Sequence, residues 1–371
     1  SDNGTEVFNK SSLTINPGRY IITAKRDSKI SETSVYVRKD WSWYLIQAAR
    51  AAQYAPQKAS THMESWLGYF SAFYAALYYP EYSNLDVLLD DFNKTFSLMM
   101  NLETGELYDF CDPNRIQNIS MAVSLLTLVY RVCKDEKYLS CASKLADRII
   151  SLQSEDGAYR SYNVHYTCVS YIAKSLMEYY EVAINLPDFA DSAQRCRDSI
   201  CAAIKNLVEL EDNIQTEGEI TFEDGMISCE VLQLALFALQ FPELSDERIV
   251  SLAEKLLRKH RCLEQQNVPD CRQRGCTIRF WESMYDVLIQ RNFINSPHGW
   301  TAWKVYGTYY LYLLTGKLEY LIDTFDTLGA CVQCVDINSG KLRWGFISDP
   351  CVCAEVLYQR EWRKFGKKVF G

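Results

Sequence analysis

The chain has 371 residues, of which 48% are hydrophobic, and its formal net charge at pH 7 is −8. This length supports one large core, and the acidic balance indicates no basic face, so we expect no nucleic-acid partner. No run of about 18 apolar residues occurs, so no membrane span is expected.

The first 38 residues differ from the rest of the chain. Residues 16–25 read as a turn followed by a β-strand, and residues 33–38 read as the partner strand. Because a lone hairpin is not stable in water, it must dock on another element. The pattern is typical of the C-terminal strands of an immunoglobulin-like β-sandwich. We therefore expect the earlier strands to come from a missing N-terminal β-domain or from a second chain.

Residues 39–371 are expected to form one helical, catalytic domain. Asp40 is a suitable N-cap, and apolar and aromatic residues then recur at helical spacing. Helical hairpins with no strands between them predict a mainly α fold, an (α/α)6-type toroid, with an α-solenoid as the alternative. The helices are expected at residues 41–57, 63–79, 84–100, 117–133, 136–153, 166–183, 188–210, 227–241, 246–261, 277–291, 300–315, 318–334 and 350–364.

Cysteine and motif patterns give little sign of a metal or cofactor. The chain has 14 cysteines, and Cys331 and Cys334, together with Cys351 and Cys353, could in principle hold zinc. The short second spacing and the lack of a nearby His favour buried free thiols instead. The sequence contains no P-loop, GxGxxG, GxSxG or HExxH pattern. We therefore expect no metal and no cofactor.

Residues 159–166 form the strongest candidate site. They lie where a loop enters an apolar helix, and the partial positive charge of a helix N-terminus favours an anionic ligand. An imidazole can move a proton, and aromatic rings can stack on sugars. The alternative for the histidine is a hydrogen-bonded structural role. The candidates here are His165 and Tyr166 for catalysis, and Tyr159, Arg160, Tyr162 and Asn163 for substrate binding.

Two further loop-to-helix junctions carry polar and aromatic residues. In the first, His62 could act as an acid or base and Trp66 as a sugar platform. A capped helix start with Trp66 in the core explains the same residues. In the second, Arg115 could fork onto a substrate carboxylate, against the alternative of an Asp-Pro turn with a local ion pair.

A fourth cluster combines two segments near the C-terminal end of the sequence. His298 is a candidate for catalysis, and Trp300, Arg343 and Trp344 could bind substrate. Packing of the arginine stem on an indole is the alternative for Arg343 and Trp344.

Several of these segments resemble (α/α)-toroid carbohydrate-active enzymes of gut-type bacteria. Among them, the resemblance is to exo-acting L-rhamnose-α-1,4-D-glucuronate lyases of polysaccharide lyase family 27. It covers the chain from about residue 40 onward, and no catalytic position can be matched residue by residue. A periplasmic or secreted enzyme of an acidic polysaccharide or oligosaccharide is expected. The segments are residues 61–66, 154–157, 165–167, 299–304, 308–316 and 342–346.

The resemblance implies β-elimination at a uronic acid. A cation neutralises the uronate carboxylate and acidifies C5–H, a base removes that proton, and an acid protonates the leaving glycosidic oxygen. The residue types available for these roles are Arg115 or Arg343 as the cation, His165 or Tyr166 as the base, and His62 or His298 as the acid.

Two other functions remain open at this point. An unsaturated glucuronyl hydrolase of glycoside hydrolase families 88 and 105 also uses an (α/α)6 barrel, but with an aspartate as acid and base. Asp109, Asp112 or Asp224 would then carry the chemistry. A non-catalytic glycan-binding toroid would keep the aromatic platforms and would not depend on histidine.

Overall fold

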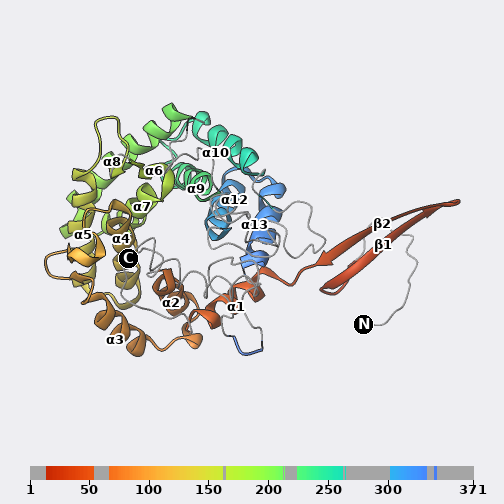
Figure 1. The fold of residues 1–371 in the computed structure, drawn as a ribbon, viewed down its shortest axis with the longest axis horizontal. Helices are drawn as coiled ribbons and strands as arrows, with labels where there is room; N and C mark the ends of the chain where they lie inside the picture. Colours follow the sequence, from red (N-terminus) through yellow and green to blue (C-terminus); the bar gives the residue numbers. More distant parts are fainter. Residues whose placement is uncertain are drawn as a thin grey trace, which may run out of the picture.

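The structure is a computed structural model that describes residues 14–53, 67–161, 164–211, 213, 224–261, 264, 301–331 and 338–340. Its helices form the ring seen in Figure 1, which confirms the predicted toroid. The inner layer contains α2 (Leu67–Tyr78), α4 (Ile116–Cys133), α7 (Ile172–Ala183), α9 (Asp224–Gln240) and α12 (Thr301–Thr315). The outer layer contains α3 (Leu85–Phe96), α5 (Glu136–Ser151), α8 (Ala190–Leu210), α10 (Glu247–His260) and α13 (Leu318–Cys331).

The sequence of each helix explains its layer. Helix α4 is buried at every position from Ile116 to Tyr130, because inner helices contact neighbours on all sides. Helix α10 instead buries one apolar stripe and exposes charged residues on its other face. Among the described helices, α4 alone is long and apolar enough to cross a membrane, and 83% of that window is buried inside the protein. Its apolar character is therefore accounted for by its place in the core.

Most of the predicted helices are confirmed within a few residues, but one prediction was wrong. The helix expected over residues 166–183 is broken at Ser170, which has extended backbone angles, into α6 (Tyr166–Val169) and α7. The buried Gln233 side chain compensates the break: its amide donates to Thr167 O at 2.7 Å and accepts from Ala173 N at 2.9 Å. The helices expected at residues 277–291 and 350–364 lie outside the described residues.

The inner helices run parallel to one another. Between α7 and α9, Ala173 N contacts Gln233 Oε1, and further along both helices Met177 O accepts from Gln240 Nε2 at 3.0 Å. The contacts therefore advance in the same direction along both helices. Gly307 of α12 packs closely on α9 as well, since a Cβ there would lie 2.9 Å from the Val231 side chain. The N-terminal ends of these helices thus gather at one end of the ring.

The ring closes where α13 meets α1 (Trp41–Ala52). Arg38, just before α1, donates to Phe325 O at 3.0 Å and pairs with Asp326 at 2.5 Å. Gly329 lies against this contact, and a Cβ there would lie 1.9 Å from the Arg38 guanidinium, which would then have to shift. Arg38 therefore anchors the chain that precedes the toroid.

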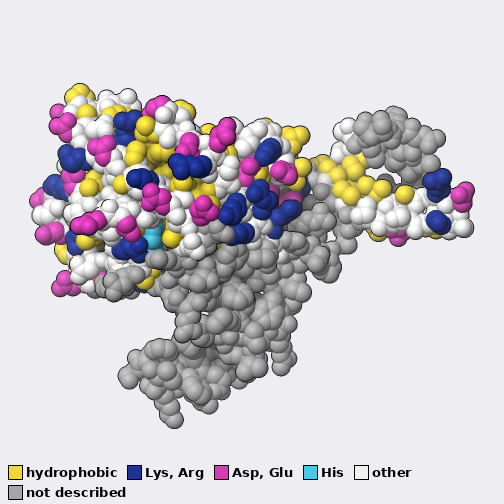
Figure 2. All heavy atoms as spheres, turned by 90° about the horizontal axis from the view of Figure 1, so that it is seen from above, with side chains coloured by type: hydrophobic (Ala, Val, Ile, Leu, Met, Phe, Trp, Pro, Cys, Tyr) yellow, Lys and Arg dark blue, Asp and Glu magenta, His cyan; other side chains and the backbone are white. Residues whose placement is uncertain are grey.

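The predicted hairpin is confirmed as β1 (Gly18–Arg26) paired antiparallel with β2 (Lys29–Val37). Figure 2 shows it extending away from the helical body, and on the face shown there acidic and basic side chains are interspersed. The expectation of no strands between the helices was wrong: the described part of the helical region contains two short hairpins, β3 (Met100–Asn101) with β4 (Glu106–Leu107) and β5 (Arg160–Ser161) with β6 (Val164–His165). These short strands shape loops between helices and are not part of the predicted β-sandwich.

Candidate functional site

The mouth of the toroid is defined here as the end formed by the N-terminal ends of α4, α7, α9 and α12 and by the loops that enter α4 and α7. Parallel packing extends from α4 to α7 through serines: Ser120 Oγ donates to Ser175 Oγ at 2.8 Å, and one turn further Ser124 Oγ donates to Glu178. Several helix N-termini therefore converge, and their partial positive charges favour anionic groups at this end.

The loop that enters α7 is held rigidly against α8. Gln153 Nε2 donates to Gly157 O at 2.7 Å and to Ser199 O at 2.9 Å. Gly157 has a positive φ of 88°, and a Cβ there would lie 2.3 Å from Ala202 O, so only glycine fits. Tyr159, predicted to bind substrate, is fully buried in this loop, and its hydroxyl lies 2.7 Å from Ser199 Oγ. Its substrate role stays a prediction.

Two predicted cationic residues come from neighbouring loops of the mouth. Arg160 pairs with Asp156 at 2.9 Å, and this hydrogen bond lowers the pKa of Asp156. The adjacent Ser161 donates to Asn114 O at 2.9 Å, which brings the loop of α7 to the loop of α4. Arg115 follows Asn114 and is the half-buried N-cap residue of α4. The structure therefore places both arginines on adjoining loops.

His165 lies in the same loop but is buried, with 1% of its surface exposed. Its Nε2 lies 2.7 Å from Asn206 Oδ1, and its Nδ1 lies 3.2 Å from Cys168 Sγ. Burial lowers the pKa of His165, which favours the neutral imidazole, while the hydrogen bond to Asn206 acts in the opposite direction. Tyr166 is also 1% exposed. The contacts with Asn206 and Cys168 are consistent with the alternative of a hydrogen-bonded structural role for His165. The catalytic roles of His165 and Tyr166 stay predictions.

Glu230 is a buried carboxyl that sequence reasoning missed. It lies two turns into α9, is 1% exposed, and neither of its oxygens forms a hydrogen bond of ordinary geometry with a described residue. Burial raises the pKa of Glu230 to about 8, although the nearby Cys168 thiol opposes part of this shift. The only carboxyl within the apolar stretch Ile227–Gln240 was the signal that could have identified it. Such a carboxyl retains its proton near neutral pH and can donate it.

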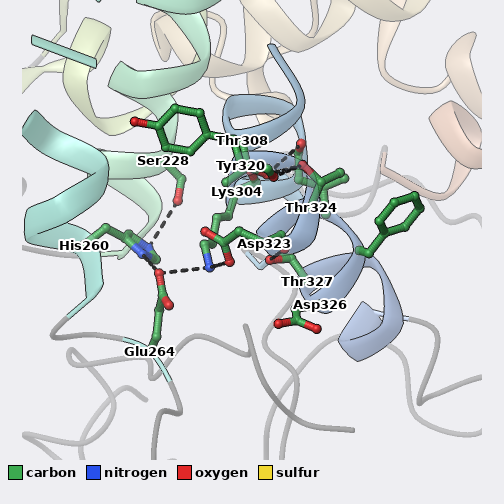
Figure 3. A network of polar contacts seen from close by, with 12 residues as sticks. Ser228, His260, Glu264, Lys304, Thr308, Tyr320, Asp323, Thr324, Asp326 and Thr327 are labelled. Atoms are coloured by element: carbon green, nitrogen blue, oxygen red, sulfur yellow. Dashed lines mark hydrogen bonds and ion pairs between the residues drawn. The ribbon is translucent and has the colours of Figure 1, made fainter. Parts of the chain in front are cut away.

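Lys304 centres a second group that the sequence did not reveal. It is 1% exposed and pairs with Glu264 at 2.9 Å and with Asp323 at 2.7 Å. His260 Nδ1 lies 3.1 Å from the same Glu264 oxygen, and His260 Nε2 lies 3.4 Å from Ser228 Oγ. Figure 3 shows Lys304 reaching from α12 between these carboxylates.

The charges of this group hold one another in the ionised state. Burial opposes the charged form of Lys304, but Asp323 and Glu264 outweigh it, so the pKa of Lys304 is raised. Burial likewise opposes the Glu264 carboxylate, and the hydrogen bond from His260 with the charge of Lys304 keeps its pKa below the usual range. The group therefore fixes the first turn of α12 at the mouth against α10 and α13.

The remaining predicted residues fall in segments that the structure does not describe. These residues are His62, Trp66, Tyr162, Asn163, His298, Trp300, Arg343 and Trp344. Cys334, Cys351 and Cys353 of the alternative zinc site lie there as well. In the described part of the chain, no group of three or more His, Cys, Asp or Glu side chains is placed to hold a metal. Five described cysteines are buried free thiols, as expected, and the free thiols of Cys133 and Cys201 are half-buried; the five are Cys111, Cys141, Cys168, Cys196 and Cys229.

Similarity to solved structures supports the fold. The chain is similar to a protein described as "Polysaccharide Lyase BACCELL_00875", with a TM-score of 0.61 and 11% identity over 88% of this chain and 51% of that one. It is also similar to an unsaturated glucuronyl hydrolase from Bacillus sp. GL1, with a TM-score of 0.51 and 12% identity over 82% of this chain and 86% of that one.

A third similar structure is a family 76 glycoside hydrolase from a bovine Bacteroides thetaiotaomicron strain, with a TM-score of 0.52 and 13% identity over 90% of this chain and 79% of that one. The chain spans about half the length of the lyase and most of the length of the two hydrolases. No protein-family model matches the chain, and the comparison with curated proteins gives no match. The shared feature is the (α/α) toroid of carbohydrate-active enzymes.

Proposed function

We propose that this chain processes a glycan, and that it cleaves a glycosidic bond to a uronic acid by exo-acting β-elimination. The observation that carries the proposal is the similarity of its toroid to a polysaccharide lyase. The mouth adds chemical support, because Arg115 and Arg160 lie on adjoining loops beside converging helix N-termini. Cations at this end suit the carboxylate of a uronic acid in an acidic polysaccharide or oligosaccharide.

The proposed reaction breaks the C4–O glycosidic bond and forms a C4=C5 double bond. Arg115 or Arg343 neutralises the uronate carboxylate and so acidifies C5–H. His165 or Tyr166 takes the C5 proton, and His62 or His298 returns a proton to the leaving oxygen. Trp66, Trp300 and Trp344 serve as sugar platforms in this proposal, with Tyr162 and Asn163 as polar contacts to the substrate.

A hydrolase acting on an unsaturated glucuronyl unit is the second candidate. The buried Glu230 favours it, since a carboxyl with a pKa of about 8 is protonated at neutral pH and hydrolysis needs such an acid. Of the aspartates considered for this role, Asp109 and Asp112 lie before α4, and Asp224 is the first residue of α9. A non-catalytic glycan-binding toroid is the third candidate.

One assay separates the three functions. The protein is incubated with uronic-acid polysaccharides and, separately, with an unsaturated glucuronyl disaccharide, while ultraviolet absorbance of the conjugated alkene is followed. A lyase raises the absorbance with the polysaccharide, a hydrolase lowers it with the disaccharide, and a binding protein changes neither. Mass spectrometry checks the result, because a lyase product is lighter by one water than the corresponding hydrolysis product. Unchanged absorbance in both incubations would reject the enzymatic proposal.

The proposal also covers the N-terminal β1–β2 hairpin and the cellular location of the protein. Ile21, Ile22 and Ile30 expose more than half of their surface, at 69%, 51% and 61%. Both edges of the β1–β2 sheet are unpaired among the described residues, and exposed sheet edges are usually covered. We propose that residues 1–38 complete a β-sandwich with strands from elsewhere, and that the enzyme is periplasmic or secreted. Protease protection of the hairpin only when those strands are present would support this arrangement.

A further inference from the structure

A pocket lies in the toroid lumen, further along most of the inner helices than the mouth. Its volume is about 280 Å³, and all its lining residues come from the inner helices α2, α4, α7, α9 and α12. Because these helices run parallel, side chains from the C-terminal halves of α2, α4, α7 and α9 meet there with two tyrosines from the middle of α12. The lining residues are Tyr74, Tyr78, Arg131, Met177, Glu178, Glu181, Leu236, Gln240, Tyr306 and Tyr310. We call this space the tyrosine pocket.

Two pairs of tyrosines form its aromatic walls. On α2, the rings of Tyr74 and Tyr78 are stacked, with centroids 6.3 Å apart and an interplanar angle of 8°. On α12, the rings of Tyr306 and Tyr310 lie 6.1 Å apart. Tyr78 exposes 57% of its surface and Tyr306 exposes 37%, so parts of both walls remain in contact with solvent. Large aromatic faces kept open at a concave site are suited to a ligand with an apolar face.

The polar groups of the pocket are fixed in place by contacts within the protein. Glu178 accepts from Tyr74 at 3.3 Å and pairs with Lys174 at 2.6 Å. Lys174 is itself enclosed, with its Nζ 5.4 Å from the centre of the Tyr306 ring. Arg131 donates to the Tyr78 hydroxyl at 3.0 Å. Since Glu178 and Glu181 are accompanied by Lys174 and Arg131, the charges around the pocket balance.

One acceptor in the wall has no partner among the described residues. Gln240 uses its amide nitrogen to donate to Met177 O at 3.0 Å. Its Oε1 is buried and accepts no hydrogen bond from a described group. A buried acceptor without a donor costs free energy, which a hydroxyl group in the pocket would recover. The pocket thus offers aromatic faces, a held carboxylate and a vacant acceptor.

We propose that the tyrosine pocket binds one neutral pyranose unit of a carbohydrate, at a site separate from the mouth. The apolar C–H face of the ring would pack on the tyrosines, and its hydroxyls would donate to Glu178 and Gln240 and accept from Arg131. Balanced charges favour a neutral ligand over a cation or a uronate. A volume of about 280 Å³ lies at the small end of ligand sites, which suits one sugar ring. This binding does not depend on catalysis at the mouth.

Ligand-observed NMR titrations of the whole chain test the proposal. The probes are the methyl glycosides of glucose, galactose and mannose, with methyl glucuronoside and choline as the charged comparisons. We expect at least one neutral glycoside to bind, and both charged probes to bind more weakly. Tyr78→Ala should weaken that binding about tenfold or more through loss of the aromatic platform, whereas Tyr78→Phe should retain most of it.

Tyr309→Ala is the matched control, because Tyr309 is a 40% exposed tyrosine of α12 that does not line the pocket. Its affinity for the glycoside should equal that of the original protein, and melting temperatures of all variants report whether they fold. The proposal is overturned if no neutral glycoside binds, if binding is unchanged in Tyr78→Ala, or if choline or the glucuronoside binds more tightly than every neutral probe. None of these monosaccharide probes carries a sugar at O4 that β-elimination could release. A failure to bind them is therefore distinct from failure of the lyase proposal.

Discussion

The mouth and the tyrosine pocket treat their charged groups differently. At the mouth, Lys304 is buried and satisfied by two carboxylates of the protein. At the tyrosine pocket, Arg131 is half-buried and donates to the hydroxyl of the solvent-exposed Tyr78. The mouth therefore encloses Lys304 between carboxylates, whereas the tyrosine pocket, which also holds the ion pair of the buried Lys174 with Glu178, leaves Tyr78 and Arg131 partly open to solvent and to a ligand.

This contrast has a physical origin in the helices themselves. The mouth gathers helix N-termini, where partial positive charge and long entering loops require fixed partners. The tyrosine pocket is lined by the C-terminal halves of α2, α4, α7 and α9 and by tyrosines from the middle of α12. Substitutions at the mouth should consequently affect both catalysis and folding, whereas substitutions at the solvent-facing Tyr78 and Arg131 of the tyrosine pocket should affect folding little. The predictions below test that contrast from the largest expected effect to the smallest.

The largest effect is expected for His165→Ala. We predict a rate lower by about 10²–10⁴-fold with the fold intact, as for loss of a general acid or base. The measurement is the rate per folded molecule, with the folded fraction taken from circular dichroism. His260→Ala is the matched control, since His260 is also buried near the mouth but lies on the outer helix α10. It should lose thermal stability and keep its rate.

Because His165 is buried, a purely structural role can be measured as well. If its contacts with Asn206 and Cys168 serve only the fold, His165→Ala will lower the melting temperature and leave the rate per folded molecule unchanged. That result would move the catalytic assignment to His62 or His298. It would also make both described histidines of the mouth end structural.

Lys304→Met should cause the largest loss of stability. It leaves Glu264 and Asp323 without their buried cation, which is expected to lower the free energy of unfolding by about 3–5 kcal/mol. Urea unfolding measures the change. Lys317→Met is the control, because Lys317 pairs with Glu254 at the surface and 49% of its side chain is exposed, so it should cost about 1 kcal/mol or less. Equal losses in the two variants would contradict the assigned difference.

Sequence patterns predicted the helices better than their junctions. The helix expected at residues 136–153 is found as α5, Glu136–Ser151, because its apolar spacing is local information. The break at Ser170 depends on Gln233, more than sixty positions away, so no local pattern could reveal it. Arg115 and Arg160 were identified as residue types, but their loops were brought together only by tertiary contacts. Tertiary contacts therefore determine the helix breaks and loop positions that the apolar periodicity of the sequence does not predict.

The same limit applies to buried charges and to the tyrosine pocket. Glu230 stands out in its sequence as a carboxyl among apolar residues, yet its raised pKa comes from packing of surrounding helices. Lys304 was noted only as part of a motif, since its partners Glu264 and Asp323 come from other parts of the chain. The tyrosine pocket requires side chains from five helices, from Tyr74 to Tyr310, and becomes visible only in the assembled ring.

Glu230 predicts a pH-dependent stability at the mouth. Its pKa rises from 4.5 to about 8 on folding, so between these values the folded protein binds a proton that the unfolded chain has lost. The stabilisation is complete below pH 4.5 and is lost as the pH rises through 8, by up to about 1.4 kcal/mol per pH unit. Glu230→Gln should remove this slope in urea unfolding measured across that range.

Glu254 provides the control of opposite sign. Burial alone would raise its pKa, but Lys317 and Tyr320 outweigh it and lower the pKa of Glu254, so its stabilisation is lost as the pH falls. Glu254→Gln should leave the loss of stability toward pH 8 unchanged. A slope that persists in Glu230→Gln would show that another group of the protein titrates in this range.

The smallest effect is expected for Arg131→Met in the tyrosine pocket. Arg131 donates to the Tyr78 hydroxyl at 3.0 Å and has no carboxylate within ion-pair distance among the described residues. Because both groups also reach solvent, the lost hydrogen bond should lower the free energy of unfolding by about 1 kcal/mol or less. Urea unfolding beside Lys304→Met compares the two cations directly. If Arg131→Met lowered the free energy of unfolding as much as Lys304→Met, the contacts of Arg131 would be needed for folding. The solvent-exposed tyrosines beside Arg131 would then serve the stability of the fold rather than the binding of a ligand.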